Sequence, residues 1–206
     1  MAQLDTLKRR ALEDLQEHEV LMLDGHFDYG NGFHGRVYLN PHHLFRQPSV
    51  IWRFAQDLIA ALPESILAQT EVVAGPVMGG ALLAHTIAGL LDGRRPLDLP
   101  PTEFAPLSVD ATGQLVLRPF YRQVLHGRRV LLADDVRNTG KTFERAKALI
   151  DEAGGTVIAT VEICDRLEAM VDVGVPNVAL AEYGAPENYP ADGCPLCAAG
   201  TPITSF

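Results

Sequence analysis

The sequence predicts an α/β fold in which a central, mostly parallel sheet is flanked by helices, and three observations support this prediction. Short apolar runs alternate with helical patterns from about residue 50 to residue 180. Two Gly-rich turns directly follow apolar runs. The composition, with 47% hydrophobic and 21% charged residues, is that of an ordinary globular domain. Strands that alternate with helices lie parallel, and ligands then bind beyond the carboxyl ends of the strands.

Each element follows from its local pattern. Residues 3–20 carry leucines at helical spacing, and we expect an amphipathic helix there. Residues 25–48 combine glycines, prolines, histidines and aromatic residues without a helical period, which predicts short strands and loops that form a lid or hood. The regular alternation follows, with helices expected over 50–62, 81–91 and 142–153 and strands over 71–74, 103–106, 115–117, 130–133, 157–163 and 178–180.

Charge and hydropathy exclude several classes of protein. The net charge is −9 and no dense block of lysine and arginine occurs, which argues against a nucleic-acid partner. The apolar runs are shorter than the roughly 18 to 20 residues that a membrane span needs, so we expect no membrane partner. The N-terminal segment is charged and lacks the apolar region of a secretory signal. We therefore expect a cytoplasmic protein.

An apolar strand that runs into two acids is the most informative motif. Residues 130–133 are apolar, Asp134 and Asp135 follow, and residues 136–142 form a polar turn that leads into a helix. A phosphate there would meet free backbone N–H groups at the start of the helix, and Gly140 would allow close approach. The two carboxylates suit the hydroxyls of a sugar attached to that phosphate. A solvated acidic turn with a threonine cap is the alternative that the local composition leaves open.

The end of this turn, Gly140-Lys141-Thr142, also resembles the end of an NTPase P-loop. That pattern requires a glycine five residues before Gly140, and position 135 is an aspartate. The aspartate side chain would crowd and repel a triphosphate. We therefore set the P-loop interpretation aside.

Residues 130–142 as a whole resemble the signature of type I phosphoribosyltransferases, which has four apolar residues, two acids and a T-G-x-T turn. Four further segments resemble the orotate phosphoribosyltransferase branch of that family. They are Gly25-His26-Phe27 with Gly32, His34, Tyr38 and Asn40, like its hood; residues 75–81, like its pyrophosphate loop; Leu117-Arg118 with Phe120, like the edge of its mobile catalytic loop; and Asp165-Arg166-Leu167-Glu168, like its D-R-x-E segment.

The resemblance implies the type I phosphoribosyltransferase fold, formed as a single domain over residues 1–206. The core would span about 49–181, and the hood would consist of about 20–48 together with the C-terminal segment. The resemblance also implies a homodimer, in which the mobile loop of one subunit reaches the site of the other.

The implied reaction is the transfer of ribose 5-phosphate from phosphoribosyl pyrophosphate (PRPP) to a nucleobase, foremost orotate, with release of pyrophosphate. Mg²⁺ would enter bound to PRPP, without a dedicated set of protein ligands. Asp134 and Asp135 would hold the ribose hydroxyls and act in catalysis with Arg118. The other implied roles are binding of the 5-phosphate by Val136, Arg137, Asn138, Thr139, Gly140, Lys141 and Thr142, of pyrophosphate by Pro76, Val77, Met78, Gly79 and Gly80, and of the base by Arg166, Asn138 and Phe27.

Departures from the family pattern leave the acceptor base and the turnover open. Between Glu103 and Arg129 the chain has no lysine, whereas the orotate enzymes usually carry lysines there that stabilise the leaving pyrophosphate. Gly30 stands where one branch has a base-contacting lysine. Transfer to a purine or another base, suggested by Lys141 and the altered hood, is one alternative. A protein that senses PRPP without turnover is another.

Several polar side chains near these motifs have two interpretations. Arg36 or His34 could replace the missing hood donor, whereas we interpret His42 and His43 as surface or packing residues. Arg166 could form an ion pair with Asp165, Glu168 or Glu162 in place of a contact with the base.

A Cys-Pro-Leu-Cys segment near the C-terminus resembles half of a zinc site. Cys194 and Cys197 have the spacing at which two thiolates bind one Zn²⁺. The missing ligands could be Cys164, the hood histidines or a second knuckle across a dimer. A reduced thiol pair packed in the C-terminal segment is the alternative.

Overall fold

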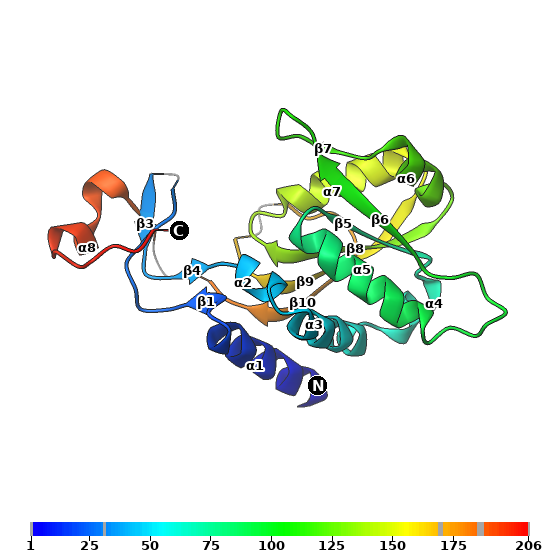
Figure 1. Ribbon diagram of the computed structural model, residues 1–206, viewed down its shortest axis with the longest axis horizontal. Coiled ribbons are helices and arrows are strands. Elements are labelled where there is room, and N and C mark those ends of the chain that lie inside the picture. The colour runs from blue at the N-terminus through cyan, green and yellow to red at the C-terminus, as the bar shows by residue number, and fades with distance from the viewer. Residues whose placement is uncertain (1, 31, 169–170, 185–187, 206) are drawn as a thin grey trace.

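A computed structural model describes residues 2–30, 32–168, 171–184 and 188–205. Its centre is a six-stranded sheet with the order β10-β9-β8-β5-β6-β7 (Figure 1). The five pairings along this order are parallel, apart from the antiparallel pair of β6 with β7. The strands are β5 (Val72–Pro76), β6 (Glu103–Val109), β7 (Leu115–Val116), β8 (Arg129–Arg137), β9 (Thr156–Asp165) and β10 (Asn177–Glu182). The predicted α/β class is therefore confirmed.

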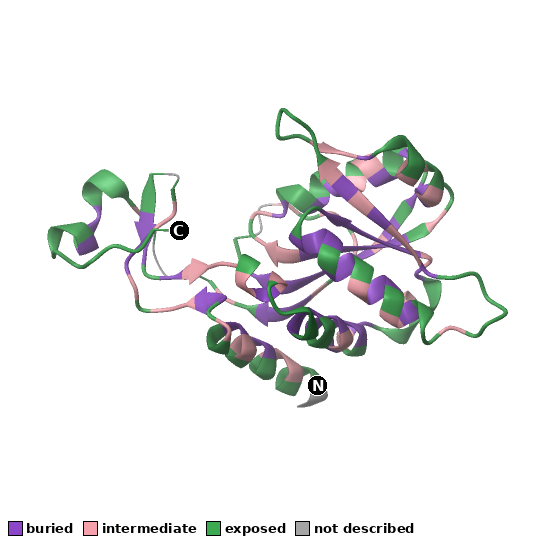
Figure 2. Cartoon of the chain, in the orientation of Figure 1, coloured by how far each residue is buried: buried purple, intermediate pink, exposed green. Residues whose placement is uncertain are grey.

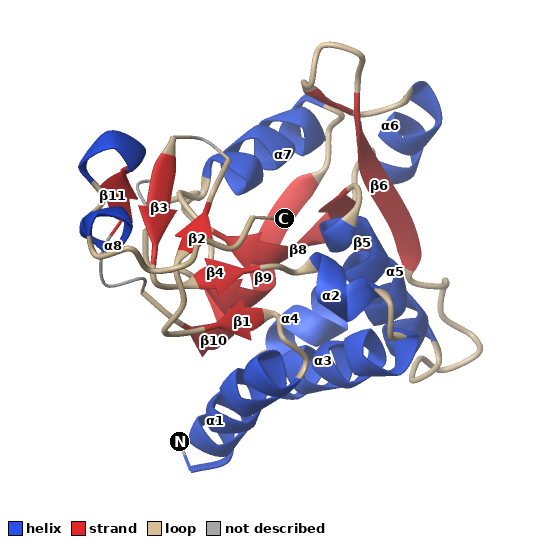
Figure 3. Cartoon of the chain, turned by 60° about the vertical axis from the view of Figure 1, so that its left-hand side comes forward, coloured by secondary structure: helices blue, strands red, loops and turns tan. Residues whose placement is uncertain are grey.

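Helices cover both faces of this sheet (Figure 3). Alternate residues of a strand point to opposite faces, so Val73 and Leu131 pack with the helices of one face, and Val72 and Leu132 pack with those of the other. Buried residues accordingly concentrate on the strands and on the inner helix faces (Figure 2). The helices are α1 (Ala2–Glu17), α3 (Pro48–Ala61), α4 (Glu64–Gln69) and α5 (Gly79–Asp92), with α6 (Pro119–Leu125) and α7 (Lys141–Glu152) in the second core cluster.

A small hood stands apart from the sheet and combines strands β2 and β3 with the C-terminal segment (Figure 1). Its three-stranded sheet has the order β11-β3-β2, so the C-terminal strand pairs with the strand at residue 33. A two-stranded ribbon of β1 and β4 connects it to the core. The elements are β1 (Leu21–Met22), β2 (Phe27–Asp28), β3 (Phe33–Gly35), β4 (Tyr38–Leu39), α2 (His42–Phe45), β11 (Asn188–Pro190), the 3₁₀ turn η1 (Ala191–Gly193) and α8 (Pro195–Ala198).

The element boundaries differ from the sequence expectations at a few places. The first helix ends at Glu17 rather than residue 20, because the chain turns at Glu19, which has a positive φ of 55°. Four short helices, α2, α4, α6 and α8, were not predicted, since four to seven residues are too few to show a helical period. In the described part of the chain, no helix is both long and apolar enough to cross a membrane.

Candidate functional site

The acidic pair lies at the carboxyl end of β8, in the middle of the sheet. Asp134 is 7% exposed, and its Oδ1 accepts a hydrogen bond from the backbone N–H of Asp135 at 3.0 Å. Asp135 Oδ1 accepts one from the N–H of Val136 at 2.8 Å. Among the described residues, neither carboxylate has an ion-pair partner within 4.0 Å. The pair therefore presents oxygens that a hydroxyl donor or a cation can satisfy.

Burial dominates the protonation of these acids. Burial raises the pKa of Asp134 well above its ordinary value, and the neighbouring charge of Asp135 raises it further. Burial also raises the pKa of Asp135, against hydrogen bonds that lower it and the nearby His42, which lowers it too. When two neighbouring buried carboxylates are both ionised, they repel each other, so the doubly ionised state of the pair is disfavoured. A ligand that donates hydrogen bonds would relieve this cost.

The predicted pyrophosphate loop packs directly against the acidic pair. A Cβ on Gly79 would collide with Asp135 Oδ2 and with the ring of Phe45, and a Cβ on Gly80 would lie 2.7 Å from Asp134 Oδ1. Glycine at positions 79 and 80 therefore allows the loop backbone to lie against the two carboxylates. The loop residues Val77 and Met78 are joined by a cis peptide bond and are 42% and 63% exposed.

The predicted phosphate turn surrounds a small cavity of about 100 Å³ between β8 and α7. Gly140 caps α7 with a φ of +82°, a left-handed conformation that favours glycine. Within the described part of the chain, the N–H groups of Thr139, Gly140 and Lys141 donate to no other backbone group. Free N–H groups at a helix start form an anion site. The cavity is lined by Asp134, Val136, Arg137, Asn138, Thr139, Gly140, Thr142 and Phe143.

Not every residue of this turn faces the cavity in the same way. Lys141 is exposed and does not line it. Arg137 turns inward: its guanidinium lies 3.5 Å from Asp165 Oδ2 and donates to the carbonyl of Val171 at 3.1 Å. Through these two contacts, the Arg137 side chain links the end of β8 to the end of β9 and to the segment that follows it.

A second cavity, of about 450 Å³, lies between the hood and the core. Two residues with predicted base-binding roles, Arg166 and Asn138, line it. The third, Phe27, does not line it, but its ring lies 5.8 Å from that of Tyr38, which does. The other lining residues are Tyr29, Phe33, Val37, Leu39, Glu168 and Asn188.

Arg166 also forms an ion pair with Glu168, which is the alternative to a contact with the base that the sequence left open. Its guanidinium lies 3.1 Å from Glu168 Oε1, and both side chains are partly exposed in the cavity. An ion pair at a wet surface contributes little stability, about 0 to 1 kcal/mol. Glu168 therefore orients the Arg166 guanidinium. Because the ion pair is weak, a ligand that binds the guanidinium in place of Glu168 loses little energy by breaking it.

Arg118, which has a predicted catalytic role, borders neither of these cavities within its own chain. It is exposed, caps α6 after the edge strand β7, and lines neither cavity. Two strands, β5 and β6, separate β7 from β8 in the sheet. The hairpin between β6 and β7 is closed by Asp110, whose Oδ1 accepts hydrogen bonds from Thr112 and Gln114.

The structure distinguishes two of the hood histidines. His34 does not line the hood cavity, because it is buried beside His26 and Cys197. His42 is exposed, as expected of a surface residue, and it also lies near enough to Asp135 to lower the pKa of that acid. Helix α2 brings His42 and Phe45 over the pyrophosphate loop, and no spacing in the sequence predicts this contact.

Sequence reasoning also missed several residues of the hood cavity. Tyr29, Phe33 and Asn188 line it, and they come from two segments that are distant in the chain. The aromatic enrichment of residues 25–48 was the only available signal for two of them. Asn188 carried none, because its position depends on the pairing of β11 with β3.

A parallel α/β sheet with a phosphate cradle, an adjacent acidic pair and a hood cavity defines a protein that binds a phosphorylated sugar beside a second ligand. The comparisons with known proteins agree with this class. Residues 48–176 match the model of the phosphoribosyl transferase domain, and the chain belongs to this family.

Similar curated proteins include orotate phosphoribosyltransferases. The chain is 31% identical to that of Erythrobacter litoralis over 175 residues, covering 85% of this chain and 84% of the relative. It is 30% identical to that of Thermotoga maritima over 191 residues, covering 93% and 94%. The crystal structure of the Aeropyrum pernix orotate phosphoribosyltransferase is similar in fold, with a TM-score of 0.62, 23% identity, and coverage of 82% of this chain and 92% of that one.

Proposed function

We propose that this protein transfers ribose 5-phosphate from PRPP to orotate and releases pyrophosphate. The observation that carries the proposal is the position of Asn138, which borders both the phosphate cavity and the hood cavity. A sugar whose 5-phosphate lies in the first cavity then has its anomeric carbon directed toward the second. The curated relatives named orotate phosphoribosyltransferase support orotate as the acceptor.

Each part of the site has a role in this reaction. The N–H groups at the start of α7 hold the 5-phosphate, and Asp134 and Asp135 accept hydrogen bonds from the ribose hydroxyls. The loop at residues 76–80 faces the pyrophosphate. Asp134 and Asp135 have no ion-pair partner among the described residues, so their oxygens could also face a Mg²⁺ ion bound through PRPP. Such an ion would neutralise charge on the leaving pyrophosphate.

The acceptor binds in the hood cavity. The Arg166 guanidinium has the planar fork that pairs with a carboxylate, and orotate carries one. In the transfer, the ring nitrogen forms a bond to the anomeric carbon as the bond from that carbon to pyrophosphate breaks, and the nitrogen releases its proton to solvent. Positive charge develops on the sugar, and the nearby carboxylates stabilise it.

We further propose that the protein is a homodimer in which Arg118 of one subunit approaches the site of the other. Exposed apolar side chains close to Arg118 support this, because Val109 and Phe120 are 50% and 67% exposed. Mixing inactive Asp135→Asn and Arg118→Ala proteins tests it. Each mixed dimer would hold one site with both residues, so activity should return to about a quarter of the wild-type value. Absence of recovery in a sample that is dimeric by light scattering contradicts the shared site.

The lysine-free hairpin between β6 and β7 favours a second candidate, a protein that binds PRPP without turnover. Purified protein with PRPP and Mg²⁺ should be assayed against orotate, uracil, adenine and hypoxanthine, by pyrophosphate release and by ligand-dependent melting. Turnover with orotate is the expected result. Turnover with a purine alone contradicts the proposed acceptor, and a melting shift without any turnover supports the sensor.

A further inference from the structure

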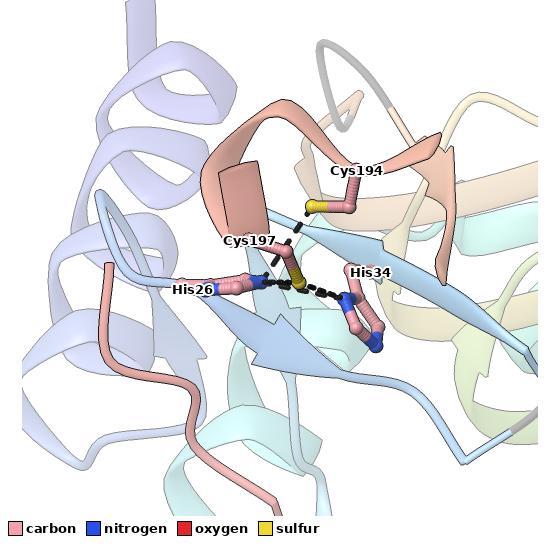
Figure 4. A group of neighbouring side chains, drawn as sticks. All are labelled: His26, His34, Cys194 and Cys197. Carbon is pink, nitrogen blue, oxygen red and sulfur yellow. Dashed lines mark hydrogen bonds between the residues drawn. The ribbon is translucent and has the colours of Figure 1, made fainter. Parts of the chain in front are cut away.

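Two cysteines of the C-terminal segment meet two histidines of the hood. Cys194 directly precedes the short helix α8 and Cys197 lies within it, His26 precedes β2, and His34 lies on β3. Their four ligand atoms all lie within 4.8 Å of one another. Figure 4 shows the side chains pointing toward one common centre. His26, His34 and Cys194 are buried, and Cys197 lies at the exposed rim.

Four of the six distances between these atoms are close to those of a tetrahedral zinc site. His26 Nε2 lies 3.3 Å from His34 Nδ1 and 3.6 Å from the sulfur of each cysteine, and His34 Nδ1 lies 3.3 Å from the sulfur of Cys197. Zinc bonds of about 2.0–2.1 Å to nitrogen and 2.3 Å to sulfur at tetrahedral angles put two nitrogens about 3.3 Å apart and a nitrogen and a sulfur about 3.6 Å apart. The set therefore encloses a centre of the right size.

Hydrogen bonds among the four groups do not account for this arrangement. His26 Nδ1 lies 2.8 Å from the carbonyl oxygen of Thr201, and because that oxygen can only accept, Nδ1 carries the proton. In the neutral ring, Nε2 then has a single lone pair. Three groups approach that lone pair, and one hydrogen bond can satisfy only one of them. A metal ion at the centre satisfies all of them at once.

The surroundings of the histidines are those of metal ligands. The carbonyl of Thr201 fixes the His26 ring with Nε2 toward the cysteines. On the other ring, His34 Nε2 lies 3.9 Å from Asp28 Oδ1, so a carboxylate stands behind it. A carbonyl or carboxylate behind the second nitrogen is the usual way in which a protein orients a metal-bound histidine.

We propose that His26, His34, Cys194 and Cys197 bind one Zn²⁺ ion with a structural role. Two thiolates with two imidazoles in a tetrahedron select zinc over the hard cations Mg²⁺ and Ca²⁺. Four protein ligands leave no position for a substrate, so the site is not catalytic. Both thiols lose their protons to solvent when the ion binds. The third cysteine, Cys164, lies outside the cluster.

The ion explains how the hood is held together. The hood sheet has only two or three residues in each strand, and its partners are distant in sequence: 168 residues separate His26 from Cys194. Units this small usually need a metal or a disulfide for stability. The proposed metal ligand His34 also pairs in register with Tyr189 of β11. The residue before Tyr189, Asn188, lines the hood cavity. The site thus anchors one wall of that cavity.

Metal analysis of the purified full-length protein tests the proposal without reference to its activity. Protein prepared under reducing conditions and without a metal-affinity tag should contain about one zinc per chain by mass spectrometry. The Cys194→Ser/Cys197→Ser variant should retain less than about a tenth of it. Cys164→Ala, which removes the cysteine outside the cluster, should retain all of it. Equal zinc in all three proteins would overturn the assignment.

A second measurement uses the wild-type protein, in case the double variant does not fold. A chelator should remove the zinc, lower the melting temperature and open residues 188–205 to proteolysis, and added Zn²⁺ should reverse these effects. Cobalt substitution should produce the thiolate charge-transfer absorption of a tetrahedral site. Wild-type protein that takes up neither zinc nor cobalt while reduced overturns the proposal, whether or not it transfers phosphoribosyl groups.

Discussion

Gly79 and Asp135 lie so close together that residue 79 has no room for a side chain. A Cβ at this position would collide with Asp135 Oδ2 and Cγ and with the ring of Phe45. This contact joins the pyrophosphate loop to the acidic pair. The two motifs, 56 positions apart in the sequence, therefore act as one surface.

The Gly79→Ala variant should lose most of its activity. The methyl group must displace Asp135 or the loop, and a shift of about 1 Å in a catalytic group can cost a factor of about 100 in rate. Steady-state assays of kcat/KM measure this loss. The matched control is Gly89→Ala in the same helix, α5, where a Cβ meets nothing within 4 Å. This control should keep its activity and become more stable by about 0.5–1 kcal/mol. Equal activity in both variants would contradict the packing argument.

The Asp135→Asn variant should bind PRPP about 10- to 100-fold more weakly. A hydrogen bond from a sugar hydroxyl to a charged carboxylate contributes about 1.5–3 kcal/mol, and the amide retains only part of it. Isothermal titration calorimetry with PRPP and Mg²⁺ measures the change. Asp98→Asn, an exposed loop substitution, should leave Kd unchanged. An unaltered Kd for Asp135→Asn refutes the ribose role.

The affinity for PRPP should increase with pH. Burial raises the pKa of both Asp134 and Asp135, so below these raised values at least one carboxyl is protonated and accepts hydrogen bonds poorly. Binding then favours the ionised form and releases protons. Calorimetry in buffers of different ionisation enthalpy detects this release, which should diminish in Asp135→Asn. Proton uptake on binding would be the opposite of the expected sign.

The Arg166→Gln variant should raise KM for orotate by about 10-fold or more, since a charge-assisted bond to its carboxylate is lost. Kd for PRPP should change little, because Arg166 lines only the hood cavity. Initial-rate kinetics with each substrate varied separate the two effects. Arg145→Gln, a change of an exposed arginine on α7, is the control. A larger change in Kd for PRPP than in KM for orotate would contradict the role of Arg166 in binding the acceptor.

Glu162 should make stability depend on pH. Burial raises the pKa of Glu162 from its ordinary 4.5 to about 7, against a hydrogen bond from Asn177. The folded state then holds a proton between pH 4.5 and 7 that the unfolded state has released, so this contribution to stability decreases as pH rises through that window. Relative to Glu162→Gln, the wild type should lose up to about 3 kcal/mol of unfolding free energy between pH 5 and 8.

Urea titrations across that pH range measure the change. Glu17→Gln, at an exposed position at the end of α1, should show the same pH profile as the wild type. Parallel profiles for the wild type and Glu162→Gln would show that Glu162 is ionised in the folded state throughout the range.

Sequence reasoning found the parts of the site that are local in the chain. The apolar run before Asp134, the left-handed Gly140 and the start of α7 follow from strand burial, turn chemistry and helix capping, all of which act over a few residues. The Gly-rich loop at residues 75–80 was identified for the same reason. The alternation of these motifs with helices was enough to predict the parallel sheet.

The sequence by itself therefore determined the fold class, and it indicated the turn after β8 and the two acids as a candidate site, because each depends on interactions between near neighbours. Only the tertiary structure decided that His34 lies with the cysteines rather than in the hood cavity, that α2 covers the pyrophosphate loop, and that Asn188 and Arg166 line the same cavity. These contacts join segments whose approach is set by strand pairing and packing, and composition and spacing along the chain do not record which distant residues will meet.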